Sequence, residues 1–526
     1  MNSYPCITSL PPFRPNYRAS GVLLHMTSLP TPYGIGDVGP AAMRWIDLLH
    51  QAGQTWWQSL PLGPTGYGNS PYQSLSSFAG NGMLISPDWL IEDGLLSAAD
   101  CVSFPTSTTV DFDKVIPFKH RLLKTAWNRF NKSARSGLAE VFDQFVCEHA
   151  HWLDDYALFR ALKAVHNNDH YLNWPIELVK RRPEAMAEAR LALAEEIQQI
   201  RFAQFLLFRQ GGRLREYAES KGIRLIGDVP FYVSPDSSDV WANPELFLLD
   251  EEHRPRFVTG VPPDYFSPQG QLWGNPVFNW EALRETGYRW YIDRVRTLLH
   301  HVDAARLDHF RGFAAAWYVP AGSSTAQSGE WVPGPGADFF RVLERELGSL
   351  PLIAEDLGYI TQDVHVLRDA FRLPGMRVLQ FAFDGKADNP HRPANYTANT
   401  LVYTGTHDNP PSRGWYEALS PDERKSVCQQ LELPSAEHEE IAWELICLAS
   451  SSVAALAVVP LQDVLNLGLE ARMNIPGRAD GNWSWRATEE MLAAPAFDRL
   501  AELTASSNRR QAAPSATKLT PVLVRS

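Results

Sequence analysis

Acidic side chains stand directly after short apolar runs at four places in this sequence. The acids are Asp228, Asp308, Glu355 and Asp408. A short apolar run predicts a buried strand, and in parallel α/β folds the carboxyl ends of the strands carry the chemistry. One such acid alone could be the N-cap of the next helix. Four acids in the same position favour a shared active site.

The richest of these four places surrounds Asp308. Arg306 precedes it by two residues, and His309 and Arg311 follow it. Alternate residues of a strand lie on the same side, so Arg306 could pair with Asp308 and keep its carboxylate ionised. A purely structural arginine–aspartate pair in the wall of a barrel would give the same pattern. The acids at the other three places favour the functional interpretation.

Helix-like sequence separates the strands that would position these acids. This alternation predicts an α/β fold, and its spacing is typical of a (β/α)8 TIM barrel with large, mainly helical insertions between barrel strands. We expect residues 20–500 to form a single catalytic barrel, with a first strand at 21–26, a helix at 40–51 and a second strand at 55–62. Residues 86–221 have helical periodicity and predict a largely helical insertion within it.

Three further segments lack the pattern of a regular element. Residues 63–74 are rich in glycine, hydroxyl groups, amides and tyrosine, which suits sugar binding, although ordinary turns share this composition. Residues 259–276 contain four prolines, three glycines and three aromatic residues and predict a stiff active-site lid loop, the alternative being a packed surface loop. Residues 501–526 predict a poorly ordered tail.

The composition narrows the class of partner. The chain has 526 residues, 44% of them hydrophobic, and a net charge of −12, which argues against nucleic acid as a partner. No stretch has the length of a membrane span or the pattern of a signal peptide. The five cysteines are scattered, so neither a disulfide framework nor a zinc site is indicated. We expect a cytoplasmic protein with no membrane partner and no metal site.

Nine different sequence motifs follow one another along most of the chain. They are residues 63–81, 227–247, 261–275, 306–313, 354–358, 405–409, 460–464, 471–474 and 481–486. In these motifs the chain resembles the amylomaltases, which are the 4-α-glucanotransferases of glycoside hydrolase family 77 and relatives of the α-amylase group. The resemblance covers residues 21–486 and leaves out only the two tails.

The resemblance implies a role for each matching residue. Asp308 would be the nucleophile, Glu355 the general acid/base and Asp408 the acid that stabilises the transition state. The residues that would bind the substrate are Ser70, Tyr72, Asp228, Trp273, Arg306, His309, Asp356, His407 and Asn474. The implied partners are maltodextrins, α-1,4-glucans derived from starch or glycogen, and glucose. The implied mechanism requires no cofactor.

The chemistry of the acids agrees with these roles. A retaining glycosidase needs two carboxyl groups about 5–5.5 Å apart, one ionised and one protonated. Arg306 would keep Asp308 ionised, whereas Glu355, next to Asp356, would hold its proton more strongly. Asp308 would carry a covalent glucanyl group until Glu355 activates the 4-hydroxyl of an acceptor glucan. The alternatives are an α-1,4-glucan hydrolase, with water as acceptor, and a non-catalytic glucan-binding protein.

The sequence departs from the family pattern at two places. Pro410 and Pro411 stand where an acidic residue and a threonine are expected, and Arg478 replaces a threonine. Consecutive prolines stiffen a loop and remove two backbone donors. Neither change alters a proposed catalytic residue, so we expect activity to be retained. The property that these changes could alter is the preferred length of the glucan.

Overall fold

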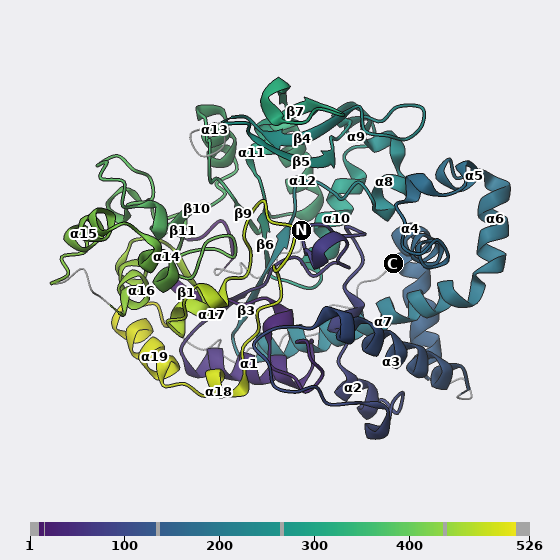
Figure 1. The fold of residues 1–526 in the computed structure, drawn as a ribbon, viewed down its shortest axis with the longest axis horizontal. Helices are drawn as coiled ribbons and strands as arrows, with labels where there is room; N and C mark the ends of the chain where they lie inside the picture. The colour runs from purple at the N-terminus through teal and green to yellow at the C-terminus, as the bar shows by residue number, and fades with distance from the viewer. Residues whose placement is uncertain (1–9, 15, 133–136, 264–267, 435–438, 512–526) are drawn as a thin grey trace.

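A closed barrel of eight parallel strands forms the centre of the protein (Figure 1). The structure, a computed structural model, describes residues 10–14, 16–132, 137–263, 268–434 and 439–511. In spatial order the strands are β1 (Ala19–Leu23), β12 (Leu456–Pro460), β11 (Thr400–Tyr403), β10 (Gly375–Val378), β9 (Leu352–Ala354), β6 (Ala304–Leu307), β3 (Arg224–Val229) and β2 (Trp56–Gln58). The predicted (β/α)8 barrel is confirmed.

The barrel strands have apolar sequences because both of their faces are covered. Every residue of β6, β11 and β12 is buried, and a strand buried on both faces has a continuous apolar run instead of an alternating one. Strand register then brings the acids together. Leu307 of β6 pairs with Ala354 of β9, so the next residues, Asp308 and Glu355, follow neighbouring strands at the same end of the barrel.

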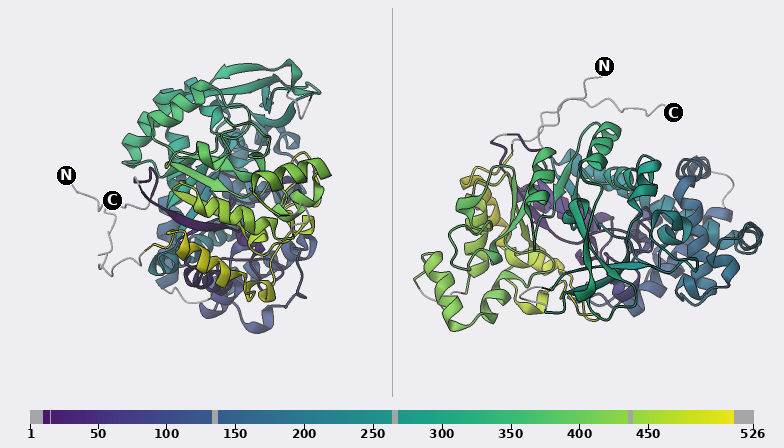
Figure 2. Two further views of the ribbon diagram at one scale, coloured as in Figure 1. Left: turned by 90° about the vertical axis from the view of Figure 1, so that its left-hand side faces the viewer. Right: turned by 90° about the horizontal axis from the view of Figure 1, so that it is seen from above.

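Helices surround the barrel and extend from two opposite ends of the molecule, with α4 to α7 at one end and α14 to α16 and α19 at the other (Figures 1 and 2). The longer helices are α1 (Pro40–Gln51), α3 (Phe112–Lys132), α4 (Gly137–Val165), α6 (Pro183–Ala192), α7 (Ala194–Ser220), α10 (Arg289–Leu299), α12 (Gly336–Leu347), α13 (Gln362–Ala370), α15 (Pro421–Gln430), α16 (Ile441–Ser451) and α19 (Ala496–Ser506). The shorter ones are α2 (Pro87–Glu92), α5 (Ile176–Val179), α8 (Ser238–Ala242), α9 (Trp280–Glu285), α11 (Arg311–Ala314), α14 (Ser412–Ala418), α17 (Leu461–Val464) and α18 (Glu489–Leu492).

Helices α2 to α7 fill the long connection between β2 and β3. Phe142 on α4 and Phe202 on α7 pack edge to face at 5.7 Å, and Phe130 on α3 stacks on Phe202 at 4.5 Å. Phe142 and Phe202 belong to the same buried cluster as Val22 and Trp57 of the barrel strands, and Phe130 packs against this cluster. The helical segment therefore packs directly on the barrel.

The predicted lid loop at residues 259–276 is wrong in its secondary structure. Its described residues contribute to β4 (Phe257–Val261) and β5 (Gln271–Pro276), which pair antiparallel, while residues 264–267 lie outside the described residues. With β7 (Ala315–Pro320) and β8 (Glu330–Pro333) these strands form a second sheet, ordered β5-β4-β7-β8. The prolines misled the prediction because they lie at the ends of the strands, where no ladder hydrogen bond is lost.

The predicted tail is also wrong for residues 501–511. Helix α19 continues to Ser506, and Arg509 is fully buried. The Arg509 guanidinium donates to the carbonyls of Ala19 and Ser450 at 2.8 and 2.7 Å. These bonds fix the segment against β1, so its polar composition does not imply disorder. The remainder of the predicted tail, residues 512–526, lies outside the described residues.

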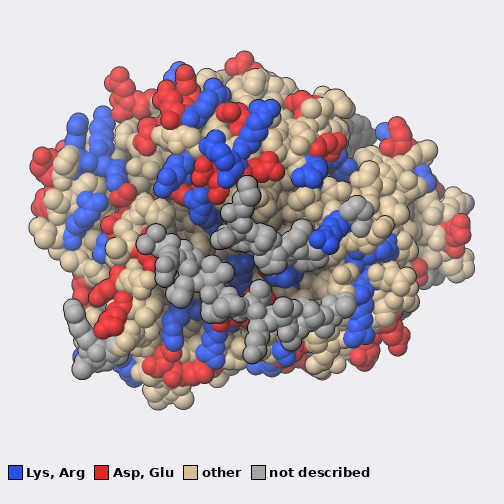
Figure 3. All heavy atoms as spheres, turned by 180° about the vertical axis from the view of Figure 1, so that it is seen from behind, with Lys and Arg blue, Asp and Glu red and all other residues tan. Residues whose placement is uncertain are grey.

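Two features bear on possible partners: the distribution of charge on the surface and the apolar character of the helices. Basic and acidic side chains are interspersed on the face shown in Figure 3. In the described part of the chain, no helix combines the length and the apolar character that crossing a bilayer requires.

Candidate active site

Arg306 joins two of the predicted acids. Its Nη1 lies 2.7 Å from Oδ2 of Asp228 and 2.9 Å from Oδ1 of Asp308. Burial acts to lower the pKa of Arg306, but Asp228 and Asp308 outweigh it and raise this pKa well above its ordinary value. Arg306 is therefore a permanent positive charge in contact with both carboxylates. The predicted pairing of Arg306 with Asp308 is present.

Glu355 is held by two backbone amides. The N–H of His309 donates to Oε2 at 2.7 Å, and the N–H of Leu357 donates to Oε1 at 2.9 Å. His309 adopts a left-handed backbone conformation, with φ of 47°, which is uncommon for a residue other than glycine. This turn, directly after Asp308, directs its amide to Glu355. Both carboxylate oxygens are thereby fixed in orientation.

Burial raises the pKa of Glu355 to about 7, and the charge of Asp308 adds to the rise while Arg306 opposes it. A carboxyl group with this pKa can release and take up a proton near neutral pH, as a general acid/base must. Sequence reasoning expected Glu355 to hold its proton, but gave the adjacent Asp356 as the cause. The structure gives burial and Asp308 instead.

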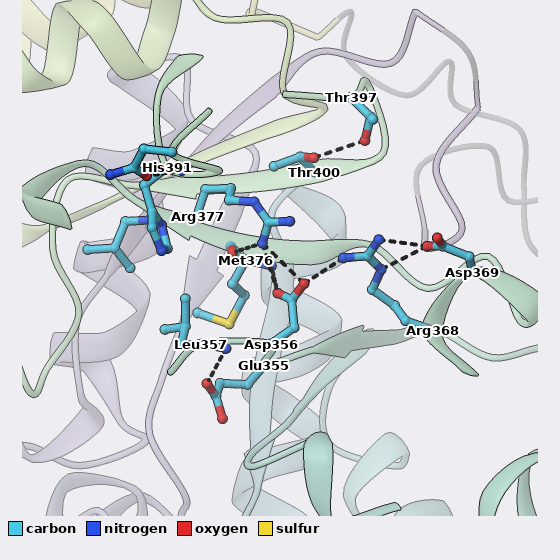
Figure 4. A network of polar contacts seen from close by, with 12 residues as sticks. Glu355, Asp356, Leu357, Arg368, Asp369, Met376, Arg377, His391, Thr397 and Thr400 are labelled. Atoms are coloured by element: carbon cyan, nitrogen blue, oxygen red, sulfur yellow. Dashed lines mark hydrogen bonds and ion pairs between the residues drawn. The ribbon is translucent and has the colours of Figure 1, made fainter. Parts of the chain in front are cut away.

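Asp356 points away from Glu355, so the structure does not place it with the other residues predicted to bind substrate (Figure 4). Its side chain is fully buried and pairs with Arg368 at 2.6 Å and Arg377 at 3.1 Å. Oδ1 also accepts the N–H of Met376 at 2.7 Å. Adjacent residues at a strand end point to opposite sides, which explains why Asp356 lies apart from Glu355. Asp356 ties the end of β9 to β10 and α13.

Asp408 is contacted by its neighbour His407 and by residues of the segment 472–474. Asn474 Nδ2 donates to Asp408 Oδ1 at 2.7 Å, and His407 Nε2 lies 3.5 Å from the same oxygen. Arg472 donates to the backbone carbonyls of Asp408 and Asn474 at 2.9 and 2.8 Å. The predicted residues Asp408, His407 and Asn474 thus lie together. Arg472 lay inside a matched motif, but no site role was assigned to it.

A cluster of aromatic rings lies between Asp408 and the ion pair of Arg306 with Asp228. Tyr72 stacks on His407, with ring centroids 5.1 Å apart, and its hydroxyl donates to Asp228 Oδ2 at 2.8 Å. Trp483 packs against both rings, at 5.8 Å from Tyr72 and 6.0 Å from His407. Ser70 lies in the same loop as Tyr72 and accepts its N–H at 3.3 Å. Sequence reasoning did not assign Trp483 to the site.

Trp273 approaches from the second sheet. It lies on β5, and its ring meets His309 edge to face at 4.9 Å. Burial lowers the pKa of His309 to about 4, and Arg311 adds to this effect while Asp308 opposes it. His309 is therefore neutral at neutral pH. The hairpin of β4 and β5 thus reaches the residue next to Asp308.

The two prolines behind Asp408 begin a helix. Pro411 is the N-cap of α14, and its carbonyl accepts the N–H of Trp415 at 2.8 Å. The carbonyl of Pro410 accepts a hydrogen bond from Gln380 Nε2 at 2.9 Å. Proline is tolerated here because the first N–H groups of a helix have no partner within it.

Among the described residues, no group of three or more His, Cys, Asp or Glu side chains could hold a metal ion.

The chain is similar to known 4-alpha-glucanotransferases over most of its length. The family model described as 4-alpha-glucanotransferase, glycoside hydrolase family 77, matches residues 24–492. The 4-alpha-glucanotransferase of Thermus thermophilus is 48% identical over 94% of this chain and 99% of its own. That of Synechocystis is 48% identical over 90% and 95%.

A solved structure has the same fold. The amylomaltase of Streptococcus agalactiae, determined in complex with acarbose, superposes with a TM-score of 0.90 at 37% identity and covers 94% of this chain and 100% of its own. The chain therefore belongs to the 4-alpha-glucanotransferases of glycoside hydrolase family 77, whose activity on α-1,4-glucans it shares.

Proposed function

We propose that this enzyme transfers α-1,4-glucan segments by a retaining double displacement, with Asp308 as nucleophile and Glu355 as general acid/base. The observation that carries the proposal is the difference between the surroundings of the two carboxyl groups. The Arg306 guanidinium lies 2.9 Å from the Asp308 carboxylate, whereas burial raises the pKa of Glu355 to about 7. Such a difference separates a nucleophile from an acid.

In the first step, a carboxylate oxygen of Asp308 attacks the anomeric carbon of the donor glucan. The bond from this carbon to the glycosidic oxygen breaks, and the proton of Glu355 passes to that oxygen. The reducing-end fragment leaves, and a glucanyl ester remains on Asp308. The backbone amides of His309 and Leu357 hold the Glu355 carboxyl group in place for the transfer.

In the second step, Glu355 takes the proton of an acceptor 4-hydroxyl group as its oxygen attacks the anomeric carbon and displaces Asp308. Each step inverts the anomeric carbon, so the α-configuration is retained. Asp408, oriented by Asn474, stabilises the positive charge that develops on the sugar in both transition states. The acceptors are maltodextrins, glucans derived from starch or glycogen, and glucose.

The remaining predicted residues, apart from Asp356, bind the glucan, with Arg306, Asp228 and His407 at the cleavage point. Tyr72 and Trp273 offer aromatic faces, and Asp228, His407 and Ser70 offer polar atoms. Arg306 and Asp228 act as one ion pair. His309 contributes through its ring beside Trp273 and its amide on Glu355.

The proposal includes a domain organisation and a location. Residues 20–500 work as one catalytic unit with the helical segment 86–221 as an insertion, which the continuous core supports. The hairpin within residues 259–276 acts as a lid, because Trp273 on β5 reaches His309. Among the described residues, Cys101, Cys147, Cys428 and Cys447 form no disulfide bond, which suits the reducing environment of the cytoplasm.

Product analysis tests the acceptor. The pure enzyme is incubated with maltotriose alone, and glucose and longer maltodextrins are followed together. We expect glucose accompanied by maltopentaose and longer chains. Glucose and maltose without longer products would identify water as the acceptor, and the absence of any product would favour a non-catalytic glucan-binding protein.

A trapping experiment tests the residue roles. The Glu355→Gln variant is incubated with α-maltosyl fluoride, whose fluoride leaves without an acid. We expect the maltosyl ester to form and to persist, because no base activates the acceptor. Mass spectrometry of peptides should locate the added maltosyl group on Asp308. A label on any other residue would contradict the assignment of the nucleophile.

A further inference from the structure

An exposed tyrosine stands on the loop that carries Glu355. Tyr359 follows Glu355 by four residues, and 67% of its surface is exposed to solvent. Gly358 precedes it with φ of 82°, a conformation that glycine adopts without strain. Leu357, two residues before Tyr359, donates its N–H to Glu355. The Cα atom of Tyr359 therefore lies within about 7.6 Å of that of Leu357.

Tyr359 is part of a row of aromatic rings. Its ring is nearly parallel to that of Trp331 on β8, at 20° with centroids 6.3 Å apart. Trp331 in turn meets Trp317 of β7 edge to face at 5.2 Å, and Trp317 Nε1 is fixed by the carbonyl of Ala326 at 2.8 Å. The row thus continues from the loop after β9 along the second sheet.

Arg311 fastens this row to the other catalytic loop. It follows Asp308 by three residues, and its guanidinium lies 3.8 Å from the centroid of Trp331 and 5.4 Å from that of Tyr359. Its Nη1 also donates to the carbonyl of Tyr359 at 3.0 Å. The rings are therefore held in place in the free protein and tied to the loops of both Asp308 and Glu355. A fixed ring loses little conformational entropy when it binds a ligand.

We propose that Tyr359 and Trp331 form an accessory binding platform for the part of an α-1,4-glucan chain on the Glu355 side of the cleavage point. An exposed aromatic face next to polar atoms suits the apolar face of a glucose ring. Glu355 protonates the leaving oxygen, so the platform on its loop takes the leaving chain and, in the second step, the acceptor chain. This inference rests on the proposed function, which assigns Glu355 as the acid.

The platform predicts a binding energy that depends on glucan length. Binding is measured by isothermal titration with maltoheptaose and with maltotriose, in a parent variant carrying Asp308→Asn so that no turnover occurs. We expect Tyr359→Ala to raise the Kd for maltoheptaose about three- to tenfold, as loss of an aromatic contact would. Maltotriose has fewer glucose units with which to reach the platform, so its Kd should change less than twofold. Tyr359→Phe, which keeps the ring, should stay within twofold of the parent for both glucans.

Val366→Ala provides a matched surface control. Val366 is an exposed apolar residue on the neighbouring helix α13, and its truncation should leave both Kd values unchanged. The platform would be refuted if Tyr359→Ala left the Kd for maltoheptaose unchanged, or changed it no more than that for maltotriose. If the Asp308→Asn parent bound neither glucan, both the platform and the proposed function would be overturned. If the parent bound both glucans and Tyr359→Ala did not change the Kd for maltoheptaose, only the platform would be overturned.

Discussion

Nη1 of Arg306 lies 2.7 Å from Oδ2 of Asp228, whose side chain is fully buried. Removal of one member of such a pair leaves a buried charge without a partner, at a cost of about 3–5 kcal/mol. We therefore expect Arg306→Met to lower the free energy of unfolding by this amount and activity at least 100-fold. Denaturant unfolding and the initial rate with maltotriose measure the two effects.

The double variant Arg306→Met, Asp228→Asn separates these effects. With the buried aspartate neutral, most of the lost stability should return. Activity should remain low, because Asp308 still lacks the cation that lies 2.9 Å from it in the native enzyme. Recovery of activity together with stability would show that Arg306 serves the fold alone.

Glu355 should set the alkaline limb of the pH profile. Its pKa of about 7 means that the acid needed for the first step is lost above neutral pH. We expect kcat/KM for maltotriose to fall above pH 7 with the slope of one proton. With α-maltosyl fluoride as donor, which needs no acid for bond cleavage, this limb should be absent from the glucanyl-forming step. A limb for maltotriose that begins above pH 9 would contradict the assignment.

The same group predicts how stability depends on pH. Because burial raises the pKa of Glu355 above its unfolded value of 4.5, the native state holds its proton longer than the unfolded state. Stability is therefore lost between about pH 4.5 and pH 7. We expect Glu355→Gln, which has no proton to lose, to gain in Tm relative to the native enzyme from pH 5 to pH 8. The exposed Glu502 on α19 offers the control, since Glu502→Gln should show no such trend.

Asp356 should act on the rate and not on the binding of substrate. Asp356→Asn weakens the pairing with Arg368 and Arg377, which releases the strand end that carries Glu355. A small displacement of a catalytic group has a large effect on rate. We expect kcat to fall about tenfold or more, with KM within twofold. Asp369 is the exposed partner of Arg368, and Asp369→Asn should leave kcat and KM unchanged. A raised KM with native kcat in Asp356→Asn would instead indicate that Asp356 contacts the substrate.

The sequence predicted those parts of the fold that depend on local pattern. Apolar runs marked the strands before Asp308 and Glu355, since strands buried on both faces must be apolar. The sequence does not predict the β4–β5 hairpin, because prolines at and beyond the strand ends indicate a loop. Arg509 was assigned to a disordered tail because its partners are backbone carbonyls, which leave no mark in the sequence.

The limits of prediction at the site are of a similar kind. The contact of Tyr72 with Trp483 joins residues far apart in the chain, and no local pattern indicates it. The left-handed backbone of His309 depends on the loop as a whole. Glu355 and Asp356 are adjacent and chemically alike, so only the direction of the strand end separates the residue that faces the site from the one that faces Arg377.

The two prolines behind Asp408 should contribute to stability more than to the choice of glucan. The structure uses their carbonyls, which accept from Gln380 and Trp415, and alanine keeps both carbonyls. We expect Pro410→Ala and Pro411→Ala each to lower the free energy of unfolding by about 0.4–1 kcal/mol, because the unfolded chain gains conformational freedom. The distribution of product lengths from maltoheptaose should match that of the native enzyme. A shift in product lengths at unchanged stability would instead show that the proline rings contact the glucan and select its length.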